Sequence, residues 1–375
     1  MELELNQDQE LFRDTTRKFL ESESPLTTVR ALADDPDGFD RRWWQRGAEL
    51  GWTALLVPED LGGGSITGAG LLDLVLVAEE MGRLVAPGPL LPVNVVASAL
   101  VASGTAEQRE TVLPALVAGE QVATWCFPEP GRRWDAGGVE LEAASTGDSF
   151  TLRGTKSPIE AAGQADHFLV TARTGGGLTQ LLVPADTPGI TVAPMESIDL
   201  VRRFAEVRFD DVTVPTSAVV GEVGGAGSDV ERQLQVALAI QSAETVGATG
   251  RVFDFTLEYA NDRYSFGRPI ASYQALKHRF ADMKLWLESS YATANACARA
   301  VQDGADDAAE LVSVAASYIG DRTPEIVEDC VQMHGGIGVT WEHDIHLYLR
   351  RVTLNRALYG GPDEHRERLA TLLGM

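Results

Sequence analysis

The sequence predicts an α+β fold of three consecutive parts: an all-helical domain over residues 1–120, a β-sandwich or barrel over 121–224, and a four-helix bundle over 225–375. Two observations carry this prediction. Apolar residues recur at helical spacing at both ends of the chain, while the middle holds short alternating segments separated by Gly, Pro and Asp. A length of 375 residues with 44% hydrophobic residues suits two or three domains.

The first part shows helix signals at the ends of its apolar segments. Gly51 suits the left-handed residue that follows a helix. Thr105 and Gln108 have the capping-box spacing that begins one. The expected helices cover residues 7–21, 39–50, 71–81 and 93–102, with another from 105.

The middle part is read as strands because its apolar segments are short and alternating. Turn-forming residues separate these segments, as expected for neighbouring strands of a sandwich or barrel. The expected strands are 122–127, 139–143, 150–153, 167–171, 178–183 and 204–209.

The last part returns to long helices after the glycines at 224–227. Ser228 and Glu231 have capping-box spacing, and no proline interrupts the pattern before Asp262. Pro324 predicts a kink or a new segment inside the third helix. Because these helices are rich in Ala and poor in charge, we expect them to pack on several sides and to make subunit contacts. The expected helices are 228–262, 269–302, one from 305 and one from 341.

The composition narrows the classes of function. A net charge of −24 disfavours nucleic acid and anionic membranes as partners. No apolar stretch approaches the ~20 residues that span a bilayer, and the acidic N-terminus predicts no signal peptide. Three dispersed cysteines fit a reducing cytoplasm. His343 and His346 have no third ligand at a supporting spacing, so no metal is predicted.

Two segments place a long polar side chain beside a turn of small residues. Residues 263–274 read Arg-Tyr-Ser-Phe-Gly-Arg-Pro-Ile-Ala-Ser-Tyr-Gln, and residues 332–340 read Gln-Met-His-Gly-Gly-Ile-Gly-Val-Thr. Such turns let backbone N–H groups approach a phosphate, and a planar guanidinium suits two phosphate oxygens.

This pair of segments resembles the flavin-pyrophosphate elements of the acyl-CoA dehydrogenase family. Stretches such as Glu49-Leu-Gly-Trp52 and Glu79-Glu-Met-Gly-Arg83 extend the resemblance over nearly the whole chain. The resemblance implies FAD as the cofactor and implies that both elements serve the FAD of a neighbouring subunit. The cofactor-binding residues it implies are Arg263, Phe266, Gly267, Gln274, Gln332, Gly335, Gly336 and Gly338.

The middle domain departs from the family pattern where a subunit contacts its own flavin. The family has Thr-Glu-Pro-Gly-x-Gly-Ser-Asp where residues 127–135 read Phe-Pro-Glu-Pro-Gly-Arg-Arg-Trp-Asp. In the family, a Trp then packs on the isoalloxazine ring and a hydroxyl bonds flavin N5. Here Pro158 replaces the aromatic residue and Glu160 replaces the hydroxyl. An ionised carboxylate has no hydrogen to donate.

The usual catalytic base is absent. Dehydrogenation needs a carboxylate to take the α-proton. The resemblance puts Gly360 where the commonest base stands and Ala237 where the alternative base stands. Glu231 matches the motif of that alternative base only if the alignment places six extra residues inside a continuous helix.

Glu244 is the remaining candidate base. It is the only charged residue between Arg232 and Arg251, and it lies two helical turns after Ala237 on the same face. One reading is a buried structural acid bonded to a hydroxyl or Trp on a neighbouring helix. The other is a displaced base, or a group that meets a polar acyl tail.

Two functions follow from the resemblance. The first is an FAD-dependent acyl-CoA dehydrogenase that forms a 2,3-enoyl thioester on CoA or on a carrier protein and passes electrons to an acceptor such as electron-transfer flavoprotein. The second is a non-catalytic subunit of a heteromeric enzyme that completes its partner's FAD site. Either implies a homo- or hetero-oligomer, a dimer or a tetramer, with shared FAD sites in the cytoplasm.

Overall fold

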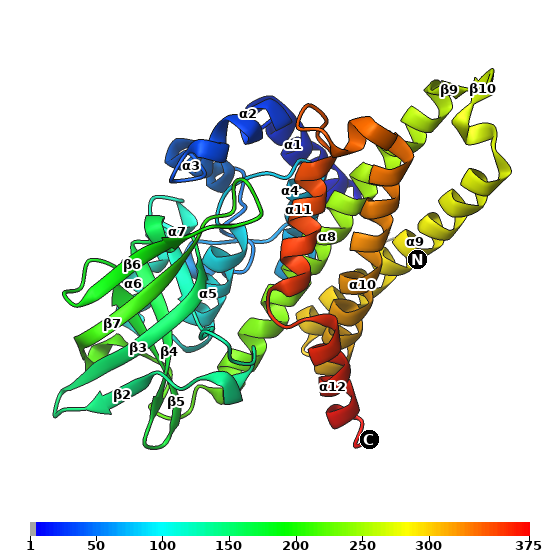
Figure 1. Cartoon of the computed structure of the whole chain (residues 1–375). Coiled ribbons are helices and arrows are strands. Elements are labelled where there is room, and N and C mark those ends of the chain that lie inside the picture. Colours follow the sequence, from blue (N-terminus) through cyan, green and yellow to red (C-terminus); the bar gives the residue numbers. More distant parts are fainter. Residues whose placement is uncertain (1–4) are drawn as a thin grey trace. The chain divides into compact units, whose positions relative to one another are not determined.

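The computed structural model describes residues 5–375, so the acidic start at 1–4 lies outside it. The described residues form two compact units. The helical unit comprises residues 5–30, Val75–Ala86 and Leu238–Met375, and the β unit comprises Ala31–Leu74 and Pro87–Ala237. Figure 1 labels their helices and strands. The predicted α+β class is confirmed, whereas domain boundaries at 120 and 224 stay a prediction.

The helical unit is built around long helices that run side by side (Figure 1). Contacts between α10 and each of α9, α11 and α12 hold the bundle together. Gly304, at φ +61°, ends α9 in the left-handed conformation. The helices are α1 (Gln7–Glu23), α2 (Leu26–Ala31), the end of α4 (Gly70–Arg83), most of α8 (Gly227–Asp262), α9 (Gln274–Asp303), α10 (Ala308–His334), α11 (Ile345–Ala357) and α12 (Pro362–Leu372).

Three sequence predictions for these helices need correction. Pro324 lies inside α10 and does not begin a new segment. The last predicted helix is two helices, because Pro362 starts α12 after a break at Leu358–Gly361. Ser228 lies within α8 and is therefore not its N-cap, and the Glu231 side chain accepts a hydrogen bond from Gln235.

Glycines let α4 and α8 cross closely inside the helical unit. A Cβ at Gly82 would lie 1.9 Å from the Glu244 carbonyl oxygen, and one at Gly247 would lie 2.1 Å from the Glu79 carbonyl oxygen. Both distances are far below van der Waals contact, so no other residue fits at this crossing. The crossing holds the Glu244 backbone against α4.

Eight strands among residues 5–375 form the sheet of the β unit, in the order β6-β7-β3-β2-β4-β5-β8, with β1 pairing in parallel with β4. Buried aliphatic and aromatic side chains from these strands make its core. The strands are β1 (Ala123–Cys126), β2 (Glu142–Ser145), β3 (Ser149–Glu160), β4 (His167–Thr174), β5 (Gly177–Pro184), β6 (Ile190–Met195), β7 (Phe204–Pro215) and β8 (Val219–Val220).

The sequence prediction found the buried strands and missed β6 and β8. β6 lies at the edge of the sheet with mostly exposed side chains, and β8 has only two residues. In β6 the alternation of Ile190 and Val192 ends at Ala193-Pro194, and β8 is too short to show any pattern. The expected helices of this unit are present, and Gly51 has the predicted positive φ, +98°. They are α3 (Arg41–Glu49), α5 (Leu90–Ser103), α6 (Ala106–Thr111) and α7 (Leu113–Val117).

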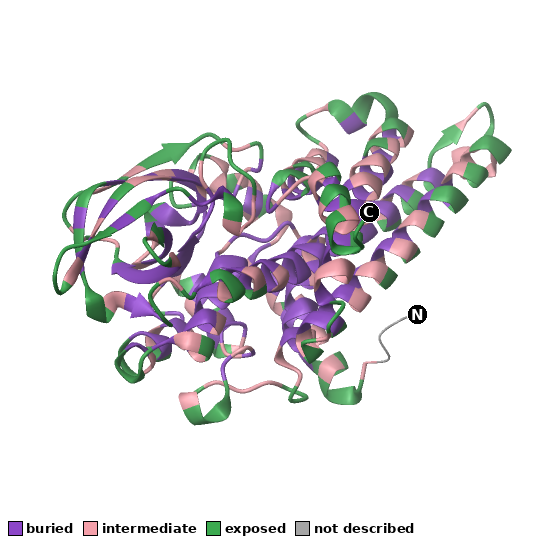
Figure 2. Ribbon diagram, turned by 90° about the horizontal axis from the view of Figure 1, so that it is seen from below, coloured by how far each residue is buried: buried purple, intermediate pink, exposed green. Residues whose placement is uncertain are grey.

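Burial differs sharply along the helical unit. Figure 2 shows that the interior of the bundle is buried, whereas the hairpin of β9 (Tyr264–Ser265) and β10 (Arg268–Pro269) is largely exposed. No helix in the described part of the chain is both long and apolar enough to cross a membrane.

Candidate functional site

The arginine motif forms an exposed hairpin between α8 and α9. Arg263 follows the last turn of α8, and strands β9 and β10 pair directly after it. Phe266 and Gly267 make the turn with φ of +52° and +82°, and the Phe266 side chain is 97% exposed. Arg263 and Gln274 are both exposed, so their polar groups can reach a ligand outside this unit.

The glycine motif forms a turn at the end of α10. Gly335 has φ +64°, and residues Gly335–Val339 continue as a short 3₁₀ helix. A Cβ built at Gly335 or Gly336 would meet nothing within 4 Å, so no side chain crowds the backbone of this turn. Gln332 lies exposed on the last turn of α10.

A ring contact brings the two motifs to the same end of the helical unit. Tyr259, one turn before Arg263, stacks on His334 with 4.4 Å between the ring centres. His334 immediately precedes Gly335, so the hairpin and the glycine turn are neighbours. Large apolar side chains at this end are exposed to solvent. They are Tyr264, Phe266, Ile337, Val339 and Trp341.

Gly360, at the expected base position, lies in the loop between α11 and α12. Its φ is +102°, which disfavours any side chain. A Cβ there would lie 3.0 Å from His365 Nε2 and 3.2 Å from Glu364 Oε2. Ala237, at the alternative position, is fully buried in α8. Neither position holds a group that accepts a proton.

Glu244 is held by a buried ion pair. Its Oε1 accepts a hydrogen bond from Arg351 Nη1 at 2.7 Å, and its Oε2 accepts one from Asn355 Nδ2 at 2.9 Å. The Glu244 side chain is 15% exposed, whereas the Arg351 side chain is fully buried. Both carboxylate oxygens are therefore engaged. This arrangement favours the structural reading of Glu244, although a guanidinium and an amide replace the expected hydroxyl or Trp partner.

Sequence reasoning missed Arg351 and Asn355. Arg351 also donates to the backbone carbonyls of Val85 and Ala86 at 3.3–3.4 Å, so it ties α11 to the end of α4. These partners lie more than 100 residues from Glu244 in the sequence. The sequence offered one signal for a buried arginine. Arg351, the second residue of the Arg350–Arg351 pair, lies inside a segment whose apolar residues have helical spacing.

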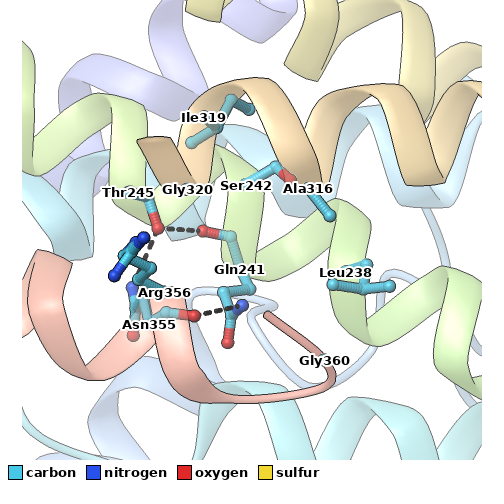
Figure 3. A pocket seen from close by; sticks show the side chains of 10 residues that line it. All are labelled: Leu238, Gln241, Ser242, Thr245, Ala316, Ile319, Gly320, Asn355, Arg356 and Gly360. Atoms are coloured by element: carbon cyan, nitrogen blue, oxygen red, sulfur yellow. Dashed lines mark hydrogen bonds between the residues drawn. The ribbon is translucent and has the colours of Figure 1, made fainter. Parts of the chain in front are cut away.

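A small cavity with mixed polar and apolar lining lies beside Gly360 in the helical unit (Figure 3). Gln241 Nε2 donates to the Asn355 carbonyl oxygen at 2.9 Å, while the buried Gln241 Oε1 has no partner among residues 5–375. The cavity volume is about 20 Å³, which holds roughly one water. An acyl chain does not fit. The lining residues are Leu238, Gln241, Ser242, Thr245, Ala316, Ile319, Gly320, Asn355, Arg356 and Gly360.

In the β unit, Glu160 stands where the family has the hydroxyl that bonds flavin N5, and its carboxylate forms an ion pair. Glu160, at the end of β3, accepts two hydrogen bonds from Arg202, at 2.7 Å from Nε and 2.6 Å from Nη2. Both side chains are more than nine-tenths buried. Nearby, the fully buried Lys156 pairs with Glu129 at 2.7 Å, and burial lowers the pKa of Lys156 while Glu129 opposes that shift. Glu160 therefore presents no donor to a flavin.

The histidines near the glycine turn pack against other aromatic rings. His343 lies 4.5 Å from His334 between ring centres, and His346 stacks on Trp341 at 4.8 Å. Within residues 5–375, no group of three or more His, Cys, Asp or Glu side chains is placed to hold a metal ion.

Known proteins are similar to this chain in sequence and in fold. The N-terminal, middle and C-terminal domains of acyl-CoA dehydrogenases match residues 6–120, 124–212 and 227–372. The acyl-CoA dehydrogenase IpdE2 of Mycolicibacterium smegmatis is 31% identical over 97% of this chain and 98% of its own length.

Two solved structures of paired proteins are also similar. The ChsE4-ChsE5 complex from Mycobacterium tuberculosis matches with a TM-score of 0.89 and 26% identity, covering 100% of this chain and 99% of that chain. The Tcur3481-Tcur3483 steroid ACAD matches with a TM-score of 0.88 and 28% identity, covering 98% and 97%. The chain therefore belongs to the acyl-CoA dehydrogenase family of FAD-dependent oxidoreductases.

Proposed function

We propose that this chain is a subunit of an FAD-dependent acyl-CoA dehydrogenase in which it completes a neighbouring subunit's flavin site and does not itself supply the catalytic base. The reaction forms a 2,3-enoyl thioester by removal of the α-proton and the β-hydride. FAD, when bound, supplies the acceptor for the hydride. Gly360 at the base position is the observation that carries the proposal.

The exposed end of the helical unit fits the diphosphate of FAD. Arg263 offers a planar cation, and its side chain contacts no acidic group among residues 5–375. The open space around Gly335 and Gly336 lets a phosphate approach the backbone of the turn. Gln332 and Gln274 add exposed amides nearby. Phe266 and Gly267 form the turn that presents Arg263. These residues are the ones we propose for cofactor binding.

The β unit does not fit the flavin contacts of the chain's own subunit. The Glu160 carboxylate uses both oxygens on Arg202, so it cannot donate to flavin N5. Pro158 has no aromatic ring to pack on an isoalloxazine. The chain's own middle domain therefore lacks both the ring and the donor that would contact an FAD there.

The helical unit lacks an available proton acceptor at the expected places. Gly360 and Ala237 have no ionisable group, and Glu244 is bonded to Arg351 and Asn355. In this proposal, the carboxylate that takes the α-proton belongs to a second, different chain. The similar ChsE4-ChsE5 and Tcur3481-Tcur3483 structures each combine two named proteins, which agrees with such pairing.

The remaining partners follow from the reaction class. The substrate is an acyl thioester of CoA or of a carrier protein, and the electrons pass to an acceptor such as electron-transfer flavoprotein. We place the chain in the cytoplasm because Cys126, Cys297 and Cys330 are all buried free thiols, as a reducing compartment allows.

Substitution of Arg263 tests the flavin role directly. Arg263→Ala removes a charge-assisted hydrogen bond, so we expect FAD binding to the assembled oligomer to weaken by about 1.5–3 kcal/mol. Flavin absorbance per oligomer after dialysis measures this. Arg268→Ala is the matched control, because Arg268 lies on the same hairpin with its guanidinium stacked over Tyr273 at 3.9 Å. Equal flavin retention in both variants would refute the assignment.

A further inference from the structure

Trp341 is an exposed aromatic side chain next to the glycine turn. It lies three residues after Gly338, and 54% of its surface is exposed. Three residues of extended chain span at most about 10 Å, so the ring is within reach of a ligand bound at the turn. A single exposed Trp is ordinary on a protein surface. Trp341 differs from an ordinary exposed Trp because other side chains pack against one face of its ring.

One face of the Trp341 ring is held by two side chains. The His346 ring stacks on it at 4.8 Å between centres, with 22° between the ring planes. His346 Nε2 also lies 3.3 Å from the Trp341 carbonyl oxygen. The Arg30 guanidinium lies over the Trp341 ring at 5.3 Å, and Asp344 pairs with Arg30 at 2.7 Å. These contacts fix the orientation of the indole.

Both supporting groups lie on the same side of the indole. Arg30 Nη2 is 3.4 Å from His346 Nε2. If the indole lay between them, two layers of van der Waals contact would separate these atoms by about 7 Å. The exposed area of Trp341 therefore belongs to the opposite face and to the ring edge.

The supporting layer carries no net charge at neutral pH. Burial lowers the pKa of His346, so its ring is neutral, and Asp344 balances Arg30. The open face of Trp341 is thus a fixed and uncharged aromatic plate. Such a plate suits a flat π system, because stacking between a base and an aromatic ring needs no charge or hydrogen bond.

We propose that the open face of Trp341 stacks on the adenine ring of the FAD whose diphosphate lies at the Gly335–Gly338 turn. The proposal rests on the proposed function, which places that diphosphate there. The ribose links adenine to the diphosphate, so a diphosphate held at the turn keeps the adenine close to the turn, and Trp341 is an exposed ring within that distance. His346 and Arg30 act as positioning residues that keep the indole flat against its ligand.

Three substitutions at Trp341 test the proposal in the assembled, flavin-loaded oligomer. The FAD dissociation constant is measured by reconstitution of the deflavinated protein. We expect Trp341→Ala and Trp341→Leu each to weaken FAD binding by about tenfold. Trp341→Phe should stay within about threefold of the parent, since Phe keeps a ring to stack. Size-exclusion chromatography checks that each variant assembles.

The alternative cover for this ring is an apolar surface of the neighbouring subunit. Wild-type affinity in Trp341→Leu would favour that cover and overturn the stacking proposal, as would unchanged affinity in Trp341→Ala. Dissociation of the Trp341→Ala oligomer would overturn it also. Arg263→Ala is measured in parallel. If Arg263→Ala weakens FAD binding and Trp341→Ala does not, only the stacking proposal fails. If neither substitution changes the FAD dissociation constant, the proposed function fails.

Discussion

Replacement of Glu244 by Gln separates a structural acid from a catalytic base. The amide keeps the shape of the carboxylate, but one of its two positions becomes an NH₂ group. That group then faces either Arg351 Nη1 or Asn355 Nδ2, so a donor opposes a donor. The substitution also removes the carboxylate charge that pairs with the fully buried Arg351.

The magnitude follows from the loss of this buried ion pair. Removal of one partner of a buried ion pair costs about 3–5 kcal/mol. Glu244 is 15% exposed and Arg351 keeps two backbone acceptors, so we expect the lower end, about 3 kcal/mol. Urea unfolding followed by helical circular dichroism measures it. FAD content of the assembled oligomer should not change.

A double variant provides the control. Glu244→Leu with Arg351→Met removes both charges, and such a replacement is often neutral or stabilising. The double variant should therefore be more stable than Glu244→Gln. Full stability in Glu244→Gln together with loss of flavin reduction by substrate would refute the structural reading and make Glu244 the base.

Three other predictions concern Gly360, Glu160 and His365. Gly360→Glu should not create an active base, and the side chain at φ +102° should destabilise the protein by about 1–3 kcal/mol, measured by thermal unfolding and by flavin bleaching with an acyl-CoA. Increased bleaching would contradict this. Glu160→Thr restores the family's hydroxyl but removes the carboxylate that pairs with buried Arg202, so we expect about 3–5 kcal/mol of destabilisation in urea and no gain of flavin. Flavin bound by that variant alone would count against our account of the β unit. Burial lowers the pKa of His365 to about 4, below its ordinary value of 6.5, so the unfolded state binds the proton first. The stability from neutral His365 is complete above about pH 6.5 and is lost as the pH falls towards 4. His365→Gln should remove this loss, and an unchanged pH profile would contradict it. The pH profile of the variant must be compared with that of the parent, because Glu79 has the opposite effect. Burial raises the pKa of Glu79 to about 7, so protonation of Glu79 increases stability as the pH falls over this range.

The sequence predicted the elements whose signals are local. Alternation gave the buried strands, helical spacing gave the long helices, and the capping box at Thr105 is present with both hydrogen bonds. Edge strand β6 was missed because its side chains are mostly exposed, and Ser228 was misread as a cap because capping-box spacing also occurs inside helices.

The site was predictable only where a motif is contiguous. The turns of the arginine hairpin and of the glycine motif were expected from their contiguous sequences, and the family resemblance put a glycine at the base position; the roles of these residues in binding FAD stay predictions. The partners of the two unusual acids were not found. Arg202 is 42 residues from Glu160, and Arg351 is 107 residues from Glu244. Only tertiary packing brings such pairs together, and a single sequence does not show which distant residues are in contact.

The purified chain alone gives the most direct test of the central claim. Its visible spectrum is recorded before and after anaerobic addition of a saturated straight-chain acyl-CoA. We predict that little or no flavin is bound, or that any bound flavin is reduced roughly 10²–10⁴ times more slowly than in an enzyme that has its base. A yellow protein whose flavin bleaches rapidly would contradict the account, because a base would then be present within this chain.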